Sequence, residues 1–265
     1  MSDFLKRIIS ERRLAINAAK KIIPIADLQK AVKSQPPPRS LLGQLQANPG
    51  NNRVNIIAEM KRASPAEGTL CPDLNPAQLA RAYENAGAAA ISILTEPRYF
   101  SGQDADIREA RKSVHLPILR KDFTVDPWQV YQSAFLGADV ILLIVAALDL
   151  PLLKELYAAT GEARLETIIE VHSLSELKIA LQFEKAIIGV NSRNLATLKT
   201  DLAIAVKLAK HIPKERVAIA ESGIKSRLEI EQLMELGYRG YLIGTSLLKA
   251  KSPGRALAEL VGKPL

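Results

Sequence analysis

Five charged side chains stand at or just beyond the ends of short aliphatic runs in this sequence. Glu59 and Lys61 end the first run, Lys121 ends another, and Glu170 and Glu221 end two more. A positioned carboxylate can accept a proton, and a positioned ammonium can donate one. Residues of these types, each placed where a strand would finish, predict acid–base chemistry on a small substrate.

The spacing of these groups places them at one end of a sheet. Alternate residues of a strand point to the same face, so Glu59 and Lys61 would point together into the interior of a closed sheet. Any one of the groups could be a structural ion pair or a rim charge. Unpaired buried charges are costly, however, and a whole set persists only if its members pair or react. The sequence therefore predicts an active site of two lysines, three glutamates and an asparagine, namely Glu59, Lys61, Lys121, Glu170, Asn191 and Glu221.

Two small turns that contain glycine follow the last two aliphatic runs. They are Ser222-Gly223 and Gly244-Thr245-Ser246. Either turn alone could simply connect a strand to a helix. Together, after adjacent strands of a barrel, such turns expose backbone N–H groups that bind phosphate. The pair therefore predicts a phosphate site.

The elements that must position these groups repeat one theme from about residue 54 onward. A short aliphatic run is followed by a loop and then by an amphipathic helical pattern. The runs do not alternate strictly, which is typical of parallel strands buried on both faces. Eight such runs favour an α/β fold, a (β/α)8 TIM barrel, over an open doubly wound sheet, whose glycine fingerprint is missing. The predicted strands are 54–60, 89–94, 117–121, 140–145, 167–170, 186–190, 217–220 and 240–244.

Helix ends can be read between several of these runs. A capping side chain, in two cases followed by proline, precedes an apolar pattern that stops at a glycine. This asymmetry is typical of α-helices. The predicted helices lie between residues 75 and 87, 126 and 137, and 226 and 237.

Residues 1–53 are predicted to form an N-terminal extension to a catalytic barrel of residues 54–265, within a single domain. Apolar spacing predicts a helix over Asp3–Lys21. Three prolines at 36–38 break any helix, and residues 48–52 have the composition of a loop. The extension could be a disordered tail or a plug at the bottom of the barrel. The sharper hypothesis is a helix folded over the barrel mouth.

The segment 62–68, just after the first run, is polar and ends in glycine. It could be a mobile lid or a plain connection. Lys61, at its base, could reach a phosphate or a carboxylate.

Other reactive residue types are better explained by structure. His115, His172 and His211 lie in no metal-binding spacing, so we expect no metal site, and we expect His172 at the rim. Cys71 is the single cysteine, which excludes an intramolecular disulfide. We expect it to be a small loop residue rather than a nucleophile. Trp128 is expected to pack a helix against the barrel rather than to bind a ligand.

The composition is that of a soluble protein with an aliphatic core. Hydrophobic residues make up 48% of the chain, charged residues 24% and aromatic residues 5%. The net charge of +8 is interspersed with acidic residues, which disfavours nucleic acid and a membrane surface as partners. No apolar run reaches membrane-spanning length, and the N-terminus lacks the apolar core of a signal peptide. We therefore expect a cytoplasmic protein.

The motifs resemble those of the indole-3-glycerol-phosphate synthase family along nearly the whole chain. The string IIAEMKRASPAEG at 56–68 is similar to the family signature, in which Glu-x-Lys-x-x-Ser-Pro ends the first strand. Ala66 departs from the pattern, because the family usually has a small hydroxyl residue there. Further similar strings follow in order: SILTEPRYFSG, PILRKDF, ADVILLIVA, IIEVH, GVNSRNL, AESGI and LIGTSLL.

The resemblance implies a carboxy-lyase of tryptophan biosynthesis that uses no metal or organic cofactor. Its substrate, 1-(2-carboxyphenylamino)-1-deoxyribulose 5-phosphate, would cyclise and lose carbon dioxide and then water. The product would be indole-3-glycerol phosphate. We expect this small molecule as the main partner, with transient contacts to other enzymes of the tryptophan pathway.

The resemblance also implies roles for individual residues. Lys121 would be the general acid of ring closure, Lys61 would bind the substrate carboxylate, and Glu170 would be the general base of dehydration. Glu59 would position the substrate amine and the lysines. Substrate orientation would fall to Asn191, Arg193 and Ser222, with Ser64 and Glu221 also binding substrate. Phe100 and Leu195 would wall the aromatic ring, and Gly223, Gly244, Thr245 and Ser246 would bind phosphate.

Two other functions remain as alternatives. Phosphoribosylanthranilate isomerase, a sister barrel, would need a cysteine at the end of the first strand, where this chain has Glu59 and Lys61. A catalytically inactive barrel that serves as a scaffold or binds nucleic acid would not need the intact set of lysines and glutamates. Formation of a fluorescent indole and a nucleic-acid binding test would separate these alternatives.

Overall fold

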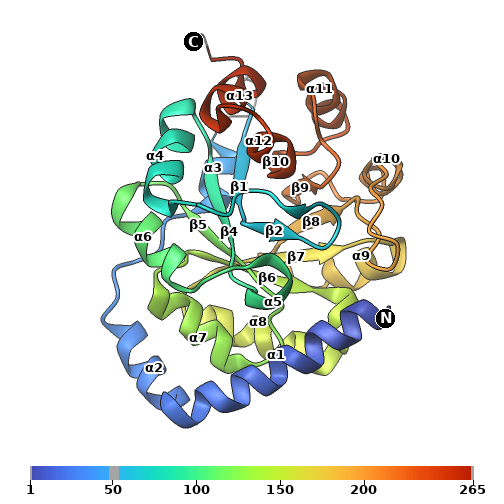
Figure 1. The fold of residues 1–265 in the computed structure, drawn as a ribbon. Coiled ribbons are helices and arrows are strands. Elements are labelled where there is room, and N and C mark those ends of the chain that lie inside the picture. Colours follow the sequence, from blue (N-terminus) through green and yellow to red (C-terminus); the bar gives the residue numbers. More distant parts are fainter. Residues whose placement is uncertain (1, 48–53, 264–265) are drawn as a thin grey trace.

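The computed structural model describes residues 2–47 and 54–263, so the predicted loop at 48–52 lies outside the described residues. Eight parallel strands close into a barrel in the order β1-β10-β9-β8-β7-β6-β5-β4 (Figure 1). The eight predicted strands are confirmed, and their bounds differ from the expected ones by at most two residues. The strands are β1 (Ile56–Met60), β4 (Ala90–Leu94), β5 (Ile118–Lys121), β6 (Val140–Ile144), β7 (Glu166–Val171), β8 (Ile187–Asn191), β9 (Ala218–Glu221) and β10 (Gly240–Ile243).

Helices form a ring around this barrel. The three predicted helices are confirmed, and their ends have the expected caps. Asn75 and Asp126 accept hydrogen bonds from backbone N–H groups of the first turn, and Ser226 forms a capping box with Glu229. The helices of the ring are α4 (Pro76–Ala86), α6 (Ala105–Ser113), α7 (Pro127–Leu136), α8 (Leu150–Glu162), α9 (Leu174–Ala180), α10 (Ala203–Ala209), α11 (Arg227–Glu235) and α13 (Pro253–Val261).

Short elements follow four of the strands at their carboxyl ends. A two-stranded antiparallel hairpin follows β1, and short helical turns follow β4, β6 and β10. None of these was predicted, because each is too short to show a periodic pattern. They are β2 (Ala63–Ser64) and β3 (Gly68–Thr69), α5 (Pro97–Phe100), the 3₁₀ turn η1 (Val145–Ala147) and α12 (Thr245–Leu248).

The core is aliphatic and lies both inside the barrel and between the strands and the ring of helices. Nearly every strand residue is buried, which explains why the strand sequences do not alternate. None of the helices in the described residues is both long enough and apolar enough to cross a membrane.

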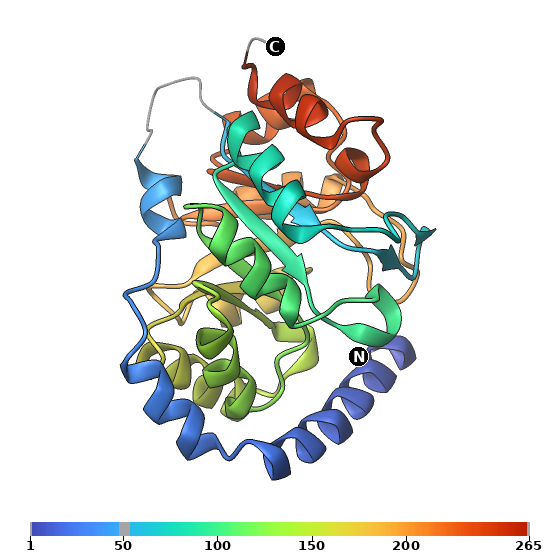
Figure 2. The same cartoon turned by 60° about the vertical axis from the view of Figure 1, so that its left-hand side comes forward.

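The first helix of the N-terminal extension, α1 (Asp3–Ile22), lies at the mouth of the barrel. Ser2 Oγ donates a hydrogen bond to the carbonyl of Leu195, which follows β8 (3.1 Å). Arg12 is ion-paired with Asp122, which follows β5 (2.8 Å). Figure 2 shows α1 and α2 (Ile25–Lys33), in blue, one after the other along the lower edge of the molecule. The hypothesis of a helix folded over the mouth therefore describes α1.

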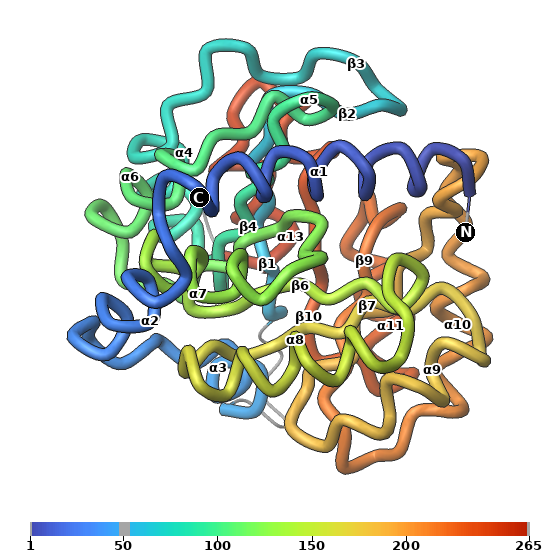
Figure 3. The backbone as a smooth tube through the Cα atoms, turned by 90° about the horizontal axis from the view of Figure 1, so that it is seen from below, coloured from blue at the N-terminus to red at the C-terminus, as the bar shows by residue number. Residues whose placement is uncertain are grey.

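The rest of the extension reaches the opposite end of the barrel. Helix α2 (Ile25–Lys33) packs on α7, and α3 (Leu41–Gln46) follows. Glu166, at the start of β7, accepts hydrogen bonds from Ser40 Oγ (2.5 Å) and from the backbone N–H of Leu42 (2.9 Å). In Figure 3, α1 crosses the molecule on one side and α3 lies well away from it. The alternative of a bottom plug thus describes α3, so the extension contacts both ends of the barrel.

Candidate functional site

A cavity of 1040 Å³ opens at the carboxyl ends of the barrel strands. Most of the residues predicted for the site line this cavity, although they come from seven strands and the loops that follow them. These residues are Glu59, Lys61, Phe100, Lys121, Glu170, Asn191, Arg193, Leu195, Ser222, Gly223, Gly244, Thr245 and Ser246. The fold therefore brings together most of the residues that the sequence predicts for the site.

Two predicted site residues do not line the cavity. Ser64 lies in the hairpin after β1, where its hydroxyl accepts a hydrogen bond from the backbone N–H of Glu67 (3.2 Å). Glu221 lies below the cavity floor, and its side chain is 1% exposed. Ser64 thus shapes the hairpin in this structure, and Glu221 contacts the cavity only through its neighbours.

Lys121 lies between two buried carboxylates. Its Nζ is 2.8 Å from Glu221 Oε2 and 3.2 Å from Glu170 Oε2. Burial disfavours the charged ammonium, but the carboxylates of Glu221, Glu170 and Glu59 outweigh burial and raise the pKa of Lys121 above its ordinary value. Lys121 therefore carries its proton at neutral pH and can deliver it to a substrate oxygen in the cavity.

The two carboxylates beside Lys121 differ in their pKa. Burial raises the pKa of Glu170, but Lys121, His172 and Asn191 together lower it below the ordinary value. Burial raises the pKa of Glu221 above its ordinary value, and the charge of Lys121 does not fully offset that effect. One oxygen of Glu221, Oε1, has no hydrogen-bond partner among residues 2–47 and 54–263. Of these two carboxylates, Glu170 is thus the ionised one, and it is the one that lines the cavity.

A second pair of opposite charges lies at the end of β1. Lys61 Nζ is 2.5 Å from Glu59 Oε1, and both side chains are at most 10% exposed. Gly244 leaves space for this carboxylate, because a Cβ at position 244 would lie 2.6 Å from Glu59 Oε1. The lack of a side chain at Gly244 therefore leaves room for the Glu59–Lys61 pair, in addition to forming the turn after β10.

Two aromatic rings form one wall of the cavity. The rings of Phe100 and Phe123 have centroids 6.4 Å apart, and both residues line the cavity. Phe100 ends the short helix α5, where Glu96 accepts its backbone N–H (3.2 Å) and that of Tyr99 (2.7 Å). Phe123 was missed by the sequence reasoning, although it lies only two residues after Lys121.

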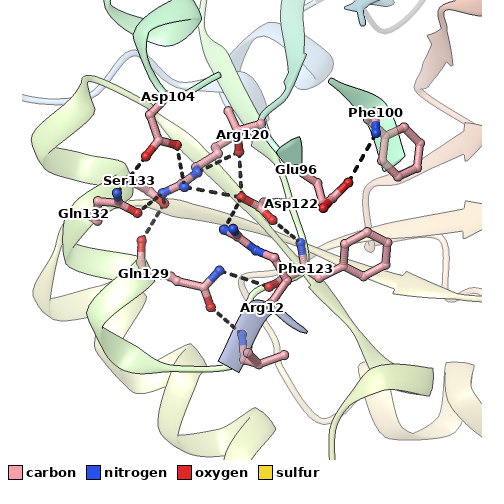
Figure 4. Close-up of polar contacts among 12 residues, drawn as sticks. Arg12, Glu96, Phe100, Asp104, Arg120, Asp122, Phe123, Gln129, Gln132 and Ser133 are labelled. Carbon is pink, nitrogen blue, oxygen red and sulfur yellow. Dashed lines mark hydrogen bonds and ion pairs between the residues drawn. The ribbon is translucent and has the colours of Figure 1, made fainter. Parts of the chain in front are cut away.

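Behind this wall, a buried network fixes the end of β5 (Figure 4). Arg120 is 2% exposed and donates to Thr95 Oγ1, Gln132 Oε1, Ser133 Oγ, Asp104 Oδ1 and Asp122 Oδ2. Asp122 Oδ1 in turn accepts the backbone N–H of Phe123 (2.8 Å), and Asp122 Oδ2 accepts from Arg12 (2.8 Å). A buried guanidinium is tolerated only with such partners. The network therefore holds the residues on either side of Lys121 in place.

The two glycine-containing turns lie together at the cavity mouth. Ser222 and Gly223 both have left-handed backbone conformations, with φ of 65° and 86°. Glycine adopts this conformation without strain, whereas serine does so at a cost. Gly244 and Thr245 form the start of α12 after the neighbouring strand β10. Lys225 and Lys249 line the same part of the cavity, which favours an anionic ligand there.

Two ion pairs anchor the hairpin that follows β1. Arg62 forms two contacts with Asp106, of 2.5 and 2.9 Å. Glu67 is ion-paired with Lys249 (2.5 Å), which follows α12. Ala66, the position that departs from the family pattern, lines the cavity. The segment predicted as a lid or a connection therefore lies over the cavity, next to the glycine turns.

The remaining candidates from the sequence are accounted for by packing. Trp128 is buried, and its Nε1 donates to the carbonyl of Ile23 (2.8 Å), so it packs α7 against the N-terminal extension. Cys71 is a partly buried free thiol. Among the residues that the structure describes, no group of three His, Cys, Asp or Glu side chains is arranged to bind a metal ion.

Comparison with known protein families identifies one family. The model of the family described as indole-3-glycerol phosphate synthase matches residues 5–260. A protein of that name from Syntrophobacter fumaroxidans is 42% identical over 262 residues, which cover 99% of this chain and 98% of the relative. Another from Rhodospirillum rubrum is 41% identical over 263 residues, covering 99% of this chain and 100% of the relative.

Solved structures share the fold at low sequence identity. A 3-hexulose-6-phosphate synthase from Salmonella typhimurium superposes with a TM-score of 0.62 at 12% identity, covering 78% of this chain and 98% of its own. A thiamine phosphate pyrophosphorylase from Pyrococcus furiosus gives a TM-score of 0.57 at 16% identity, covering 79% and 94%. At these identities the likeness shows a common barrel fold and nothing finer.

Proposed function

The chain belongs to the indole-3-glycerol phosphate synthase family, and we propose that it is a carboxy-lyase that forms an indole ring. Its substrate is 1-(2-carboxyphenylamino)-1-deoxyribulose 5-phosphate. The reaction forms one carbon–carbon bond and releases one carbon dioxide and one water, which leaves indole-3-glycerol phosphate. The proposal assigns no metal and no organic cofactor to the reaction.

Ring closure is assigned to Lys121. The aromatic carbon that bears the carboxylate attacks the ketone carbon, and the ketone oxygen must gain a proton as the bond forms. Lys121 points into the cavity and is protonated, because Glu170 and Glu221 lie within 3.2 Å of its Nζ. Loss of carbon dioxide then restores the aromatic ring. This placement of one ammonium between two buried carboxylates is the observation that carries the proposal.

Dehydration is assigned to Glu170 as general base. The carboxylate accepts a proton from carbon, and the departing hydroxyl group takes a proton from the ammonium of Lys61, which lines the same cavity, and leaves as water. Glu170 is suited to this role because it lines the cavity and is ionised. Asn191, on the adjacent strand β8, lies at the same end of the barrel and would orient the departing hydroxyl.

Lys61 is assigned to the substrate carboxylate. Its contact with Glu59 fixes the ammonium at the cavity edge, where it can form an ion pair with a second anion. Glu59 would also accept a hydrogen bond from the substrate amine. Arg193 and Ser222 line the cavity and would orient hydroxyl and carboxylate groups.

The two ends of the substrate are assigned to opposite parts of the cavity. Phe100 and Leu195, joined by Phe123, would contact the aromatic ring. Gly223, Gly244, Thr245 and Ser246 would bind the phosphate through backbone N–H and hydroxyl groups, as paired turns of this kind do in other barrels. Ser64 and Glu221 would then act on substrate indirectly, through the hairpin and through Lys121.

The proposal extends to the setting of the enzyme. A cytoplasmic location suits a free, partly buried thiol at Cys71. Transient contact with other enzymes of tryptophan biosynthesis would pass the substrate and the product between active sites.

The experiment that tests the proposed function mixes purified protein with the anthranilate-derived substrate and follows indole fluorescence. We expect fluorescence to rise in proportion to enzyme, and a filter-binding assay to retain no nucleic acid. Protein that is folded by circular dichroism but forms no indole would contradict the proposal. Retention of nucleic acid by such protein would favour the alternative of an inactive, basic barrel.

A further inference from the structure

Glu170 is held from behind by a histidine that does not belong to the cavity wall. Nε2 of His172 lies 3.2 Å from Glu170 Oε1, a charge contact without hydrogen-bond geometry, while Nζ of Lys121 donates a hydrogen bond to Glu170 Oε2 (3.2 Å). Each oxygen of this carboxylate therefore faces a different cationic group. Glu170 and Lys121 line the cavity and His172 does not, so His172 acts on a bound substrate only through Glu170.

A second carboxylate, that of Glu176, fixes the imidazole. Nδ1 of His172 lies 3.2 Å from Glu176 Oε2, and the same oxygen accepts the backbone N–H of His172 (2.8 Å). Glu176 lies in the first turn of α9, where its backbone N–H donates to the capping hydroxyl of Ser173 (3.3 Å). The start of α9 thus sets the position of Glu176, and Glu176 sets the orientation of the ring.

The two carboxylates also keep the imidazole charged. Burial disfavours the charged form of His172, but Glu170 and Glu176 outweigh it and raise its pKa to about 10. Its side chain is 12% exposed, so water screens these contacts weakly.

The arrangement of charges in the site indicates what a charged His172 can do for Glu170. Glu59 is paired with Lys61, whereas Glu170 and Glu221 share the ammonium of Lys121. Once Lys121 has protonated the ketone, Glu170 no longer has an ammonium group beside it. A charged imidazole beside Glu170 is then the nearest cation that can keep this base ionised.

We propose that His172, oriented by Glu176, is a positioning residue that directs one oxygen of Glu170 into the cavity and keeps that carboxylate ionised throughout the reaction. The inference rests on the proposed function, because it takes Glu170 to be the general base. It predicts that the chain Glu176–His172–Glu170 affects the chemical step more than substrate binding.

The kinetic test compares His172→Gln and Glu176→Gln with the wild type from pH 9 down to the lowest pH at which circular dichroism shows each protein to be folded, because the pKa of Glu170 lies below its ordinary value. His211→Gln is the matched control, because His211 is exposed and lies between α10 and the start of β9, away from the carboxyl end of that strand. We expect His172→Gln to lower kcat about tenfold or more, as loss of a residue that orients a reacting group often does, with KM changed little. The acidic limb of the kcat profile should move up by about one pH unit or more, since Glu170 loses a neighbouring positive charge. Glu176→Gln should shift both quantities in the same direction by less.

A second measurement does not depend on activity. The histidine resonances are titrated by NMR, and the signal that disappears in His172→Gln identifies His172. We expect a midpoint near pH 10 in the wild type and a lower midpoint in Glu176→Gln, because one of the two carboxylates is removed. A wild-type midpoint near the ordinary histidine value would overturn the inference.

Several outcomes separate the inference from the proposed function. Wild-type protein that forms no indole contradicts the proposed function, whatever the NMR titration gives. Active wild type with an unchanged kcat and acidic limb in folded His172→Gln overturns the inference alone. A lower kcat with an unmoved acidic limb in both variants would also overturn it, because that result marks a merely structural role. If His172→Gln does not fold, Glu176→Gln is judged by the same criteria.

Discussion

Replacing Lys121 by methionine removes the charge at the centre of the site and keeps most of the side-chain volume. General acids typically contribute about 10²–10⁴-fold in rate, which is about 2.7–5.4 kcal/mol of activation free energy. We therefore expect Lys121→Met to lower kcat by at least about a hundredfold. KM should change less, because the phosphate and the ring contact other residues of the cavity.

The same substitution should also destabilise the protein in a pH-dependent way. Glu170 and Glu221 are at most 2% exposed and would lose their shared cation. Breaking a buried ion pair costs about 3–5 kcal/mol when the remaining charge stays ionised. In the variant the pKa of these carboxylates rises above the unfolded value, so the folded state binds more protons. The loss of stability is therefore largest above that pKa and shrinks as pH falls through it.

The assay is steady-state fluorescence kinetics on Lys121→Met, Lys61→Met and the exposed control Lys112→Met. Circular dichroism and urea unfolding at pH 5 and pH 8 accompany the kinetics. If Lys121→Met keeps a near-normal kcat while Lys61→Met is inactive, the general acid is Lys61 and the two assigned roles are reversed. Equal loss of stability at both pH values would refute the account of the buried carboxylates.

Three further changes probe other parts of the site. Lys61→Ala should raise KM as well as lower kcat, because a carboxylate contact is also made in the ground state; an unchanged KM in steady-state assays would remove that contact. Gly244→Ala should raise KM for the phosphate-bearing substrate and also lower kcat, since a Cβ would lie 2.6 Å from Glu59 Oε1; an unaltered KM would argue against phosphate at this turn. Arg12→Ala should raise KM about tenfold, equivalent to about 1.4 kcal/mol of binding free energy, because the ion pair from α1 to Asp122 is lost. Arg13→Ala, at an exposed position of the same helix, is its control, and equal KM values for the two variants would deny α1 a role in binding.

The barrel could be predicted because its physical causes are local. Short runs of Val, Ile and Leu that are buried on both faces are recognisable without long-range information, and so are helix caps such as Asn75 and Ser226. The catalytic set followed from one rule, that alternate residues at the carboxyl ends of the strands point inward. Glu59, Lys121 and Glu170 obey this rule and line the cavity. The rule predicts them without any reference to the family.

The parts that were missed depend on contacts between distant segments. Glu221 obeys the same alternation but lies beneath the floor, because Gly189 opposite leaves room for its carboxylate; a Cβ at 189 would lie 2.4 Å from Glu221 Oε1. Phe123 follows a strand end, where no periodicity tells which way a side chain points. The His172–Glu176 contact depends on how α9 begins. These features depend on tertiary contacts, which the local pattern of the sequence does not reveal.

The lysines and glutamates at the barrel mouth are proposed to close the indole ring without help from a metal. The most direct measurement uses substrate labelled in its aromatic carboxylate, with a metal chelator present, and quantifies labelled carbon dioxide and indole-3-glycerol phosphate together. The account predicts that both are released in equal amounts, at a rate that the chelator does not change. Folded wild-type protein that releases neither, or that forms indole only when metal is restored, would contradict it.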